Sequence, residues 1–146
     1  MGLFLMKVYL DSNIFIYAVL DTGAHGENAR HVLHLMEEEK FEGVTGFTTF
    51  EELVFVVLRE KGMSLAIDAG KAFLLLNNLE FAPFAKESML VALEFMNEYK
   101  LKPRDAMHLA AMKSKKVLYL LTEDSDFNVV RGIKKYSMKS FLAKFG

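Results

Sequence analysis

The chain has 146 residues, of which 52% are hydrophobic and none is cysteine, and its net charge is −1. This length supports one domain with a full core, which we expect over residues 1–146, and the hydrophobic content excludes a disordered chain. The lack of cysteine excludes disulfides and thiolate metal sites, and the near-neutral charge excludes a generally polybasic protein.

The start of the chain, MGLFLMK, lacks the length and the cleavage site of a signal peptide. Every apolar run is broken well short of the ~20 residues that cross a membrane. We therefore expect a soluble cytoplasmic protein with no membrane partner. The mean hydropathy of +0.18 suggests that some apolar surface remains exposed, which favours a homodimer.

Strand and helix patterns alternate along the chain. Strands are predicted at residues 8–10, 42–47, 79–84, 117–121 and 133–136. Helices are predicted at residues 14–20, 27–40, 64–77, 86–99 and 103–115, from Thr48 or Thr49 to Glu60, and after Ser137. Pro103 suits the first position of its helix, and Pro83 marks an edge strand. Strands that alternate with helices through short loops predict a parallel sheet with helices on both faces, an α/β fold.

Charge is distributed unevenly along this pattern. Residues 1–99 carry 7 Lys/Arg against 15 Asp/Glu, whereas residues 100–146 carry 11 against 4. A basic final third suggests a partner that carries phosphate. A lysine-rich solvated surface would give the same imbalance.

Four of the six aspartates fall where a parallel sheet would gather them. Asp11 ends the first strand, which we expect to be central, and Asp124 and Asp126 follow the strand VLYLL. Asp105 lies in the first turn of the helix before that strand. The carboxyl ends of parallel strands are where such sheets bind ligands. Each acid alone also has a structural explanation, as a helix-dipole residue (Asp105) or as a turn cap.

The four acids together are harder to explain structurally. Two unit charges ~4 Å apart repel by about 4 kcal/mol at an effective dielectric of 20. Clustered carboxylates therefore oppose folding or take up protons unless a cation neutralises them. Oxygen ligands without Cys or His favour Mg²⁺ or Mn²⁺ over zinc. We expect Ser12, Asn13 and Thr122 to donate hydrogen bonds to these acids.

A further acid is expected from the segment TTFEEL, residues 48–53. Thr48 with Glu51 and Thr49 with Glu52 each fit a capping box, so both glutamates have a structural explanation. The helical period does not separate them, because residues 53–58 are apolar on every side. Such a helix is expected to be buried on several sides, for example in a homodimer.

His108 lies three residues after Asp105, on the same face of the predicted helix. A histidine there can bind a metal or contact substrate. A lone histidine beside small apolar neighbours more often packs at the rim of a site, and this is what we expect.

Four segments, LDSNIFIY, TTFEEL, RDAMHLAAM and LLTEDSDF, resemble in their order and spacing the PIN-domain family, and particularly the VapC-like toxin ribonucleases. The resemblance covers nearly the whole chain. It implies a three-layer α/β/α sandwich with a central, mainly parallel sheet. It also implies an acidic pocket with Mg²⁺ or Mn²⁺ that cuts RNA, in the toxin of a toxin–antitoxin pair.

The resemblance also assigns the acids by motif position. Asp11 matches the first acid of the family and Asp105 the third. Glu52 matches the second because an aliphatic residue follows it, with Glu51 as the rival. Asp124 and Asp126 match the T-x-D-x-D-F segment that closes the site.

We therefore predict metal-dependent hydrolysis of RNA phosphodiester bonds. Asp11, Asp105 and Asp124 would hold one or two ions, and Glu52 and Asp126 would complete or orient the ligand set. Cations from the basic third would hold flanking phosphates, namely Lys102, Arg104, Lys113, Lys115 and Lys116.

Two other classes of protein are kept as alternatives, and the first is a protein that transfers phosphate through an aspartate. A phosphatase of the haloacid-dehalogenase type needs a second Asp two residues after its nucleophile, where this chain has Asn13. A response-regulator receiver needs a Lys after a later strand, whereas Thr122 and Glu123 follow VLYLL. A non-catalytic RNA-binding or interaction module with the same fold is the other alternative, which the intact set of acids disfavours.

Overall fold

The computed structural model describes residues 5–146, so the predicted domain over residues 1–146 begins with four residues outside the described range. Within this described range five strands are formed: β1 (Lys7–Leu10), β2 (Glu42–Thr45), β3 (Leu79–Phe81), β4 (Tyr119–Leu121) and β5 (Lys134–Tyr136). The same residues form seven α-helices: α1 (Ser12–Leu20), α2 (Ala24–Glu37), α3 (Phe47–Lys61), α4 (Met63–Leu74), α5 (Lys86–Tyr99), α6 (Pro103–Ser114) and α7 (Met138–Phe145). A short 3₁₀ helix, η1, covers Ser125–Val129.

The strands form one parallel sheet in the order β3-β2-β1-β4-β5. The central position predicted for the first strand is confirmed, and so is the edge position of β3. In the middle of the sheet Tyr9 pairs with Val44 on one side and Leu120 on the other. The end of β1, and hence Asp11, is therefore supported by hydrogen-bonded neighbours on both sides.

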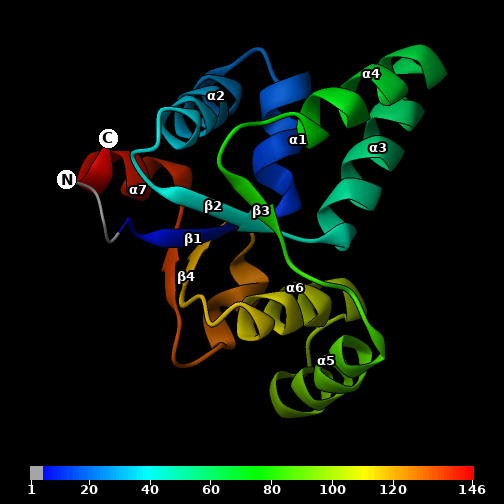
Figure 1. The fold of residues 1–146 in the computed structure, drawn as a ribbon, viewed down its shortest axis with the longest axis vertical. Coiled ribbons are helices and arrows are strands. Elements are labelled where there is room, and N and C mark those ends of the chain that lie inside the picture. Colours follow the sequence, from blue (N-terminus) through cyan, green and yellow to red (C-terminus); the bar gives the residue numbers. More distant parts are fainter. Residues whose placement is uncertain (1–4) are drawn as a thin grey trace.

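Helices cover both faces of this sheet, as predicted, and give three layers (Figure 1). Alternate residues of a strand point to opposite faces, so β1 contributes to two cores. Val8 and Leu10 pack in the core beneath α1, α2, α3, α4 and α7. Tyr9 packs in the core that faces α5 and α6. All three side chains are fully buried, which fixes the direction in which β1 presents Asp11.

Two predicted helix starts are confirmed, and the first helix begins earlier than predicted. α1 begins at Ser12 and not at Ile14, with Asp11 as its N-cap, and the side chain of Asp11 accepts a hydrogen bond from the backbone N–H of Ser12. Pro103 is the first residue of α6, where a missing N–H costs nothing. Ser137 caps α7 by accepting a hydrogen bond from the N–H of Ser140.

The prediction that Thr48 or Thr49 caps α3 is wrong. The helix begins earlier, at Phe47, with Gly46 at the N-cap position, so neither capping box forms. The hydroxyl of Thr45 donates to the carbonyl oxygen of Leu10, and Oγ1 of Thr49 lies 2.7 Å from that of Thr45. Thr49 thus joins the buried sheet edge instead of capping the helix.

Other boundaries differ by a few residues. α2 begins at Ala24, inside the predicted loop, because the carboxylate of Asp21 accepts hydrogen bonds from the N–H groups of Gly23 and Gly26. β4 begins at Tyr119 and not at Val117, because the N–H of Val117 bonds back to Met112 at the end of α6. Within residues 5–146, no helix combines the length and the hydropathy needed to cross a bilayer.

Candidate active site

A cleft of about 530 Å³ lies at the carboxyl edge of the sheet. Its walls come from the β1–α1 junction, from α3, from the start of α6 and from the segment after β4. The lining residues are Asp11, Ser12, Asn13, Ile16, Glu52, Lys102, Pro103, Arg104, Asp105, Asp124 and Asp126. Segments far apart in the sequence thus bring five carboxylates to one hollow.

Asp11 is the most rigidly held of these acids. It is 4% exposed, and hydrogen bonds reach both of its carboxylate oxygens. Ser12 donates to Oδ1 through its backbone N–H at 2.7 Å and its hydroxyl at 3.2 Å. The hydroxyl of Thr122 (2.7 Å) and the amide of Asn13 (3.2 Å) donate to Oδ2. The three residues predicted to support the acids therefore all contact Asp11.

Asp105, Asp124 and Asp126 form a second acidic group, in which one oxygen from each lies within 4.8 Å of the others. The carboxylate of Asp124 caps η1 by accepting a hydrogen bond from the N–H of Asp126 at 2.9 Å. Burial, followed by repulsion from Asp124 and Asp11, raises the pKa of Asp105 from 3.8 to about 6. The three carboxylates thus lie close together, and the charge of His108 offsets only part of the rise in the pKa of Asp105.

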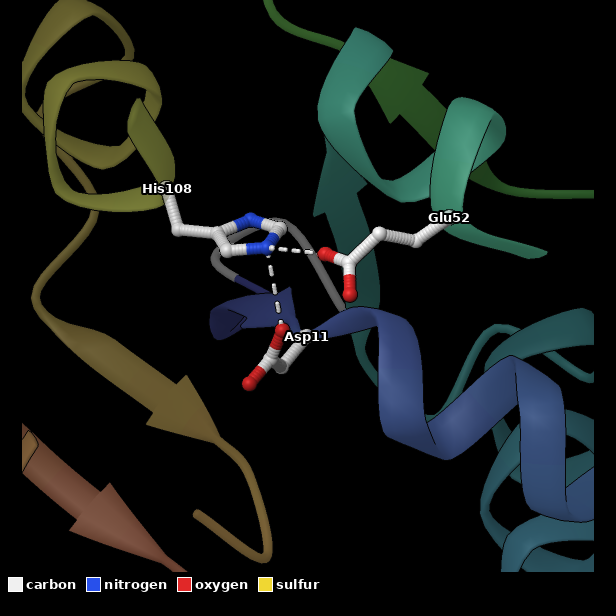
Figure 2. A group of neighbouring side chains, drawn as sticks. All are labelled: Asp11, Glu52 and His108. Atoms are coloured by element: carbon white, nitrogen blue, oxygen red, sulfur yellow. Dashed lines mark hydrogen bonds and ion pairs between the residues drawn. The ribbon is translucent and has the colours of Figure 1, made fainter. Parts of the chain in front are cut away.

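Asp11 and Glu52 differ from that group because a histidine lies between them. His108 of α6 is 1% exposed, and its Nε2 lies 3.1 Å from Asp11 Oδ1 and 3.4 Å from Glu52 Oε1 (Figure 2). Its Nδ1 lies 2.8 Å from the hydroxyl of Tyr9. Burial alone would lower the pKa of His108, but Tyr9, Asp11 and Glu52 together raise it well above its usual value. The imidazolium therefore neutralises part of this acidic pair.

The structure separates the two adjacent glutamates that the sequence left open. Glu52 lines the cleft and contacts His108, whereas Glu51 is exposed and pairs with Arg104 at 3.2 Å. Arg104 also lies 3.8 Å from Glu52. Burial would raise the pKa of Glu52, but His108, Ser12 and Arg104 hold it below its ordinary value. Glu52 is thus an ionised carboxylate facing the cleft.

The PIN domain family model matches residues 8–133, which is most of the chain. The chain belongs to the PIN domain family. The predicted family and its three-layer α/β/α fold are therefore both confirmed.

Solved structures with this fold include several VapC toxins. The structure of VapBC2 from Rickettsia felis bound to a promoter DNA fragment contains a chain with a TM-score of 0.70 and 17% identity, covering 90% of this PIN domain and 98% of that chain. For VapC20 of Mycobacterium tuberculosis, a sarcin-ricin loop cleaving toxin, the TM-score is 0.67 and the identity 18%. The match covers 87% of this chain and 97% of that chain. For VapBC-1 of nontypeable Haemophilus influenzae the TM-score is 0.67 and the identity 18%, and the match covers 92% of this chain and 99% of that chain. No curated protein sequence matches.

Two of the predicted phosphate-binding cations lie beside the acids of this PIN domain, since Lys102 and Arg104 line the cleft. The other three do not. α6 has 12 residues and so extends about 18 Å from Pro103. Lys113 and Lys116 line a different cavity near the far end of this helix, and Lys115 pairs with Glu80 of β3. Their predicted contact with phosphates at the cleft is not supported by this placement.

The prediction that His108 packs at the rim is wrong, because its ring is buried between Asp11 and Glu52. One signal in the sequence pointed there, since His108 follows Asp105 by three residues on the same helical face. The deciding contacts come from Tyr9 of β1 and Glu52 of α3. Sequence spacing within α6 alone does not reveal either contact.

Proposed function

We propose that this PIN domain is an endoribonuclease that depends on Mg²⁺ or Mn²⁺ and is the toxin of a toxin–antitoxin pair. The proposal rests mainly on the cleft, where Asp11, Glu52, Asp105, Asp124 and Asp126 meet at the carboxyl edge of the sheet. Family membership supports a nuclease. The name of one structural neighbour, a sarcin-ricin loop cleaving toxin, supports RNA as the substrate.

The donor set fits a hard divalent cation. Asp105, Asp124 and Asp126 offer only carboxylate oxygens, and these lie close enough to share one ion. Burial, followed by repulsion from Asp124 and Asp11, raises the pKa of Asp105, and a bound cation would favour its ionised form. These three residues would hold the ion, with Asp11 close enough to Asp105 to raise its pKa. When bound, the ion would act as a Lewis acid on the phosphodiester and lower the pKa of water.

The remaining side chains of the cleft would position RNA and water. Lys102 and Arg104 at its mouth would hold phosphates beside the scissile bond. Glu52 is ionised and lies beside His108 and Arg104, so it would orient the attacking water by accepting a hydrogen bond from it. His108 keeps Glu52 and Asp11 at fixed positions by contacting one oxygen of each.

The partners are also proposals. The VapBC names of two structural neighbours support an antitoxin as one partner. A homodimer is supported by large apolar side chains exposed on α3 and α4. They are Phe47, Phe55, Leu58, Met63, Leu65, Ile67 and Leu74. Leu53 and Val57 of α3 are buried within the chain, whereas Phe55 and Leu58 of the same helix remain exposed and available to a second copy.

Cleavage of a labelled RNA with Mn²⁺ or with EDTA tests the activity. We expect the parent to cut only with the metal, and Asp11→Asn and Asp105→Asn to lose about 100-fold or more of the rate. Asp68→Asn changes an exposed aspartate of α4 outside the cleft and should cut like the parent. Full activity of both cleft variants would show that the site is elsewhere.

One observation favours the non-catalytic alternative. His108 already compensates Asp11 and Glu52, so this pair does not require a metal ion for its stability. The same cleavage assay separates the two functions, because a module that only binds RNA would retain the RNA uncut in Mn²⁺.

A further inference from the structure

A second cavity, of about 430 Å³, is formed at the other edge of the sheet. Its walls are α5, the end of α6 and the segments that lead into β4 and β5. In a parallel sheet the residues before the strands lie at the amino edge, whereas the acidic cleft lies at the carboxyl edge. The two cavities are therefore separate sites.

The wall of this cavity is mainly apolar and includes two aromatic rings. Phe95 and Tyr99 of α5 stack with their centroids 6.2 Å apart and their planes at 20°. Leu109 and Met112 of α6 add aliphatic surface, and Leu118 is 60% exposed beside them. Such a wall suits a flat or compact apolar group, and the volume is in the range of small-ligand sites.

The rim of the cavity is cationic. Lys113, Lys116 and Arg131 line it, and no acid is among its lining residues. This is unusual in a chain with 19 acids against 18 Lys and Arg. In residues 5–146 none of these three cations pairs with a carboxylate, whereas the adjacent Lys115 pairs with Glu80. The Lys113 ammonium lies 5.9 Å from the centre of the Phe95 ring, so it stays at the apolar wall.

We propose that this cavity binds a nucleotide, with the base against the apolar wall and the phosphate at Lys113, Lys116 and Arg131. A phosphate monoester carries a charge of about −1.5 to −2 at neutral pH, which suits three cations better than the single charge of a peptide carboxylate. The nucleotide is either free or the 5′-phosphorylated end of an RNA that also reaches the cleft. Only the second case rests on the proposed function.

Lys116 allows a variant that removes the charge without straining the backbone. Its φ is +55°, in the left-handed region that favours glycine, and it follows the end of α6. Lys116→Gly should therefore fold at least as well as the parent. Lys100→Gly is the matched control, because Lys100 ends α5 at φ +57° and is outside the cavity lining.

The test is a titration of ¹⁵N-labelled protein in EDTA with AMP, adenosine or inorganic phosphate. We expect AMP to shift amide signals of residues 95–99, 112–118 and 130–133, and to bind about tenfold tighter than either fragment. Lys116→Gly and Arg131→Ala should each weaken AMP binding about fivefold, and Lys100→Gly should leave it unchanged. Asp105→Asn should also leave it unchanged, which separates this site from the proposed nuclease.

A hexanucleotide RNA with a 5′-phosphate, in the same buffer, distinguishes the two sources. If the nucleotide belongs to RNA, the oligomer binds more tightly than AMP and shifts signals at both cavities. If the nucleotide is free, the oligomer binds no more tightly than AMP. Equal binding of AMP and phosphate, AMP shifts outside the cavity, or tighter binding of the peptide acetyl-Asp-Leu-Phe-Glu at the same residues would each overturn the proposal.

Discussion

The acids of the cleft differ in how their charge is compensated. His108 lies between Asp11 and Glu52, so these two carboxylates keep a cationic partner inside the protein. Asp105 faces Asp124 and Asp126, and burial, followed by repulsion from Asp124 and Asp11, raises its pKa more than the charge of His108 lowers it. We infer that Asp11 and Glu52, paired with His108, stabilise the folded structure. The group of Asp105, Asp124 and Asp126 would instead be stabilised by a cation from solution.

This difference predicts how Asp105 affects stability. Its folded pKa of about 6 exceeds the ordinary 3.8, so the folded state holds a proton that the unfolded chain has released between about pH 4 and 6. Stability therefore falls as the pH rises through this window. Asp105→Asn removes the penalty, and because the carboxyl is only half-buried we expect a gain of about 1 kcal/mol at pH 7.5.

Urea unfolding in EDTA at pH 7.5 and pH 3.5 measures this effect. The gain should be present at the higher pH and largely lost at the lower one, where the parent carboxyl is mostly protonated in both states. Asp68→Asn serves as the control and should change neither value. Destabilisation by Asp105→Asn at pH 7.5 without metal would show that the carboxylate is already compensated within the protein.

The sequence predicts the positions of the acids better than it predicts the side chains that contact them. Asp11 and Asp124 follow strands and Asp105 begins a helix, so pattern alone placed them at one edge of the sheet. Which of Glu51 and Glu52 faces the cleft depends on how α3 is rotated about its axis, and the sequence does not fix this rotation. The position of His108 between the acids could not be predicted, because it depends on the tertiary contact between α6 and Tyr9. Such a contact leaves no periodic pattern in the sequence.

At the scale of the elements, the junction of α1 and α2 is set by a close backbone approach. A Cβ atom on Gly26 would lie 1.9 Å from the carbonyl oxygen of Asp21, whereas one on Gly23 would lie 3.5 Å from its nearest neighbour, the Asp21 carboxylate. Both glycines donate N–H groups to that carboxylate. Of these two glycines, only Gly26 lies where there is no room for a Cβ atom.

We expect Gly26→Ala to lower the free energy of unfolding by about 2–4 kcal/mol, because the backbone at the helix junction must move. Gly23→Ala, at the N-cap position three residues earlier, should cost less than about 1 kcal/mol. Thermal unfolding followed by circular dichroism compares the two. Equal losses would mean that the backbone at Asp21 moves aside easily.

The same junction shows where sequence patterns fail for elements. Gly23 and Gly26 are typical of a loop, yet the Asp21 carboxylate replaces the missing partners of the first turn and α2 begins at Ala24. Likewise α3 begins at Phe47, because Thr45 and Thr49 bond with each other instead of capping. Strand order and helix layers were predictable, since strands alternating with helices allow few arrangements.

In the whole molecule, the exposed apolar side chains of α3 and α4 predict self-association. Phe55 is 49% exposed and Leu58 38%, in a helix that is apolar on every side over residues 53–58. Sedimentation velocity at micromolar concentration should show about twice the mass of the chain. Phe55→Lys should shift the protein toward the monomer, and Lys139→Glu on α7 should not. A monomer at all concentrations would contradict the proposed homodimer.

The proposed function requires carboxylates of distant segments to share one divalent ion at the carboxyl edge of the sheet. Anomalous diffraction from crystals soaked in Mn²⁺ tests this directly. We predict one strong manganese peak or two, within contact of Asp105 and Asp124, and no peak there in crystals of Asp105→Asn. A well-ordered empty cleft in the soaked parent, or manganese bound only elsewhere, would contradict the central claim.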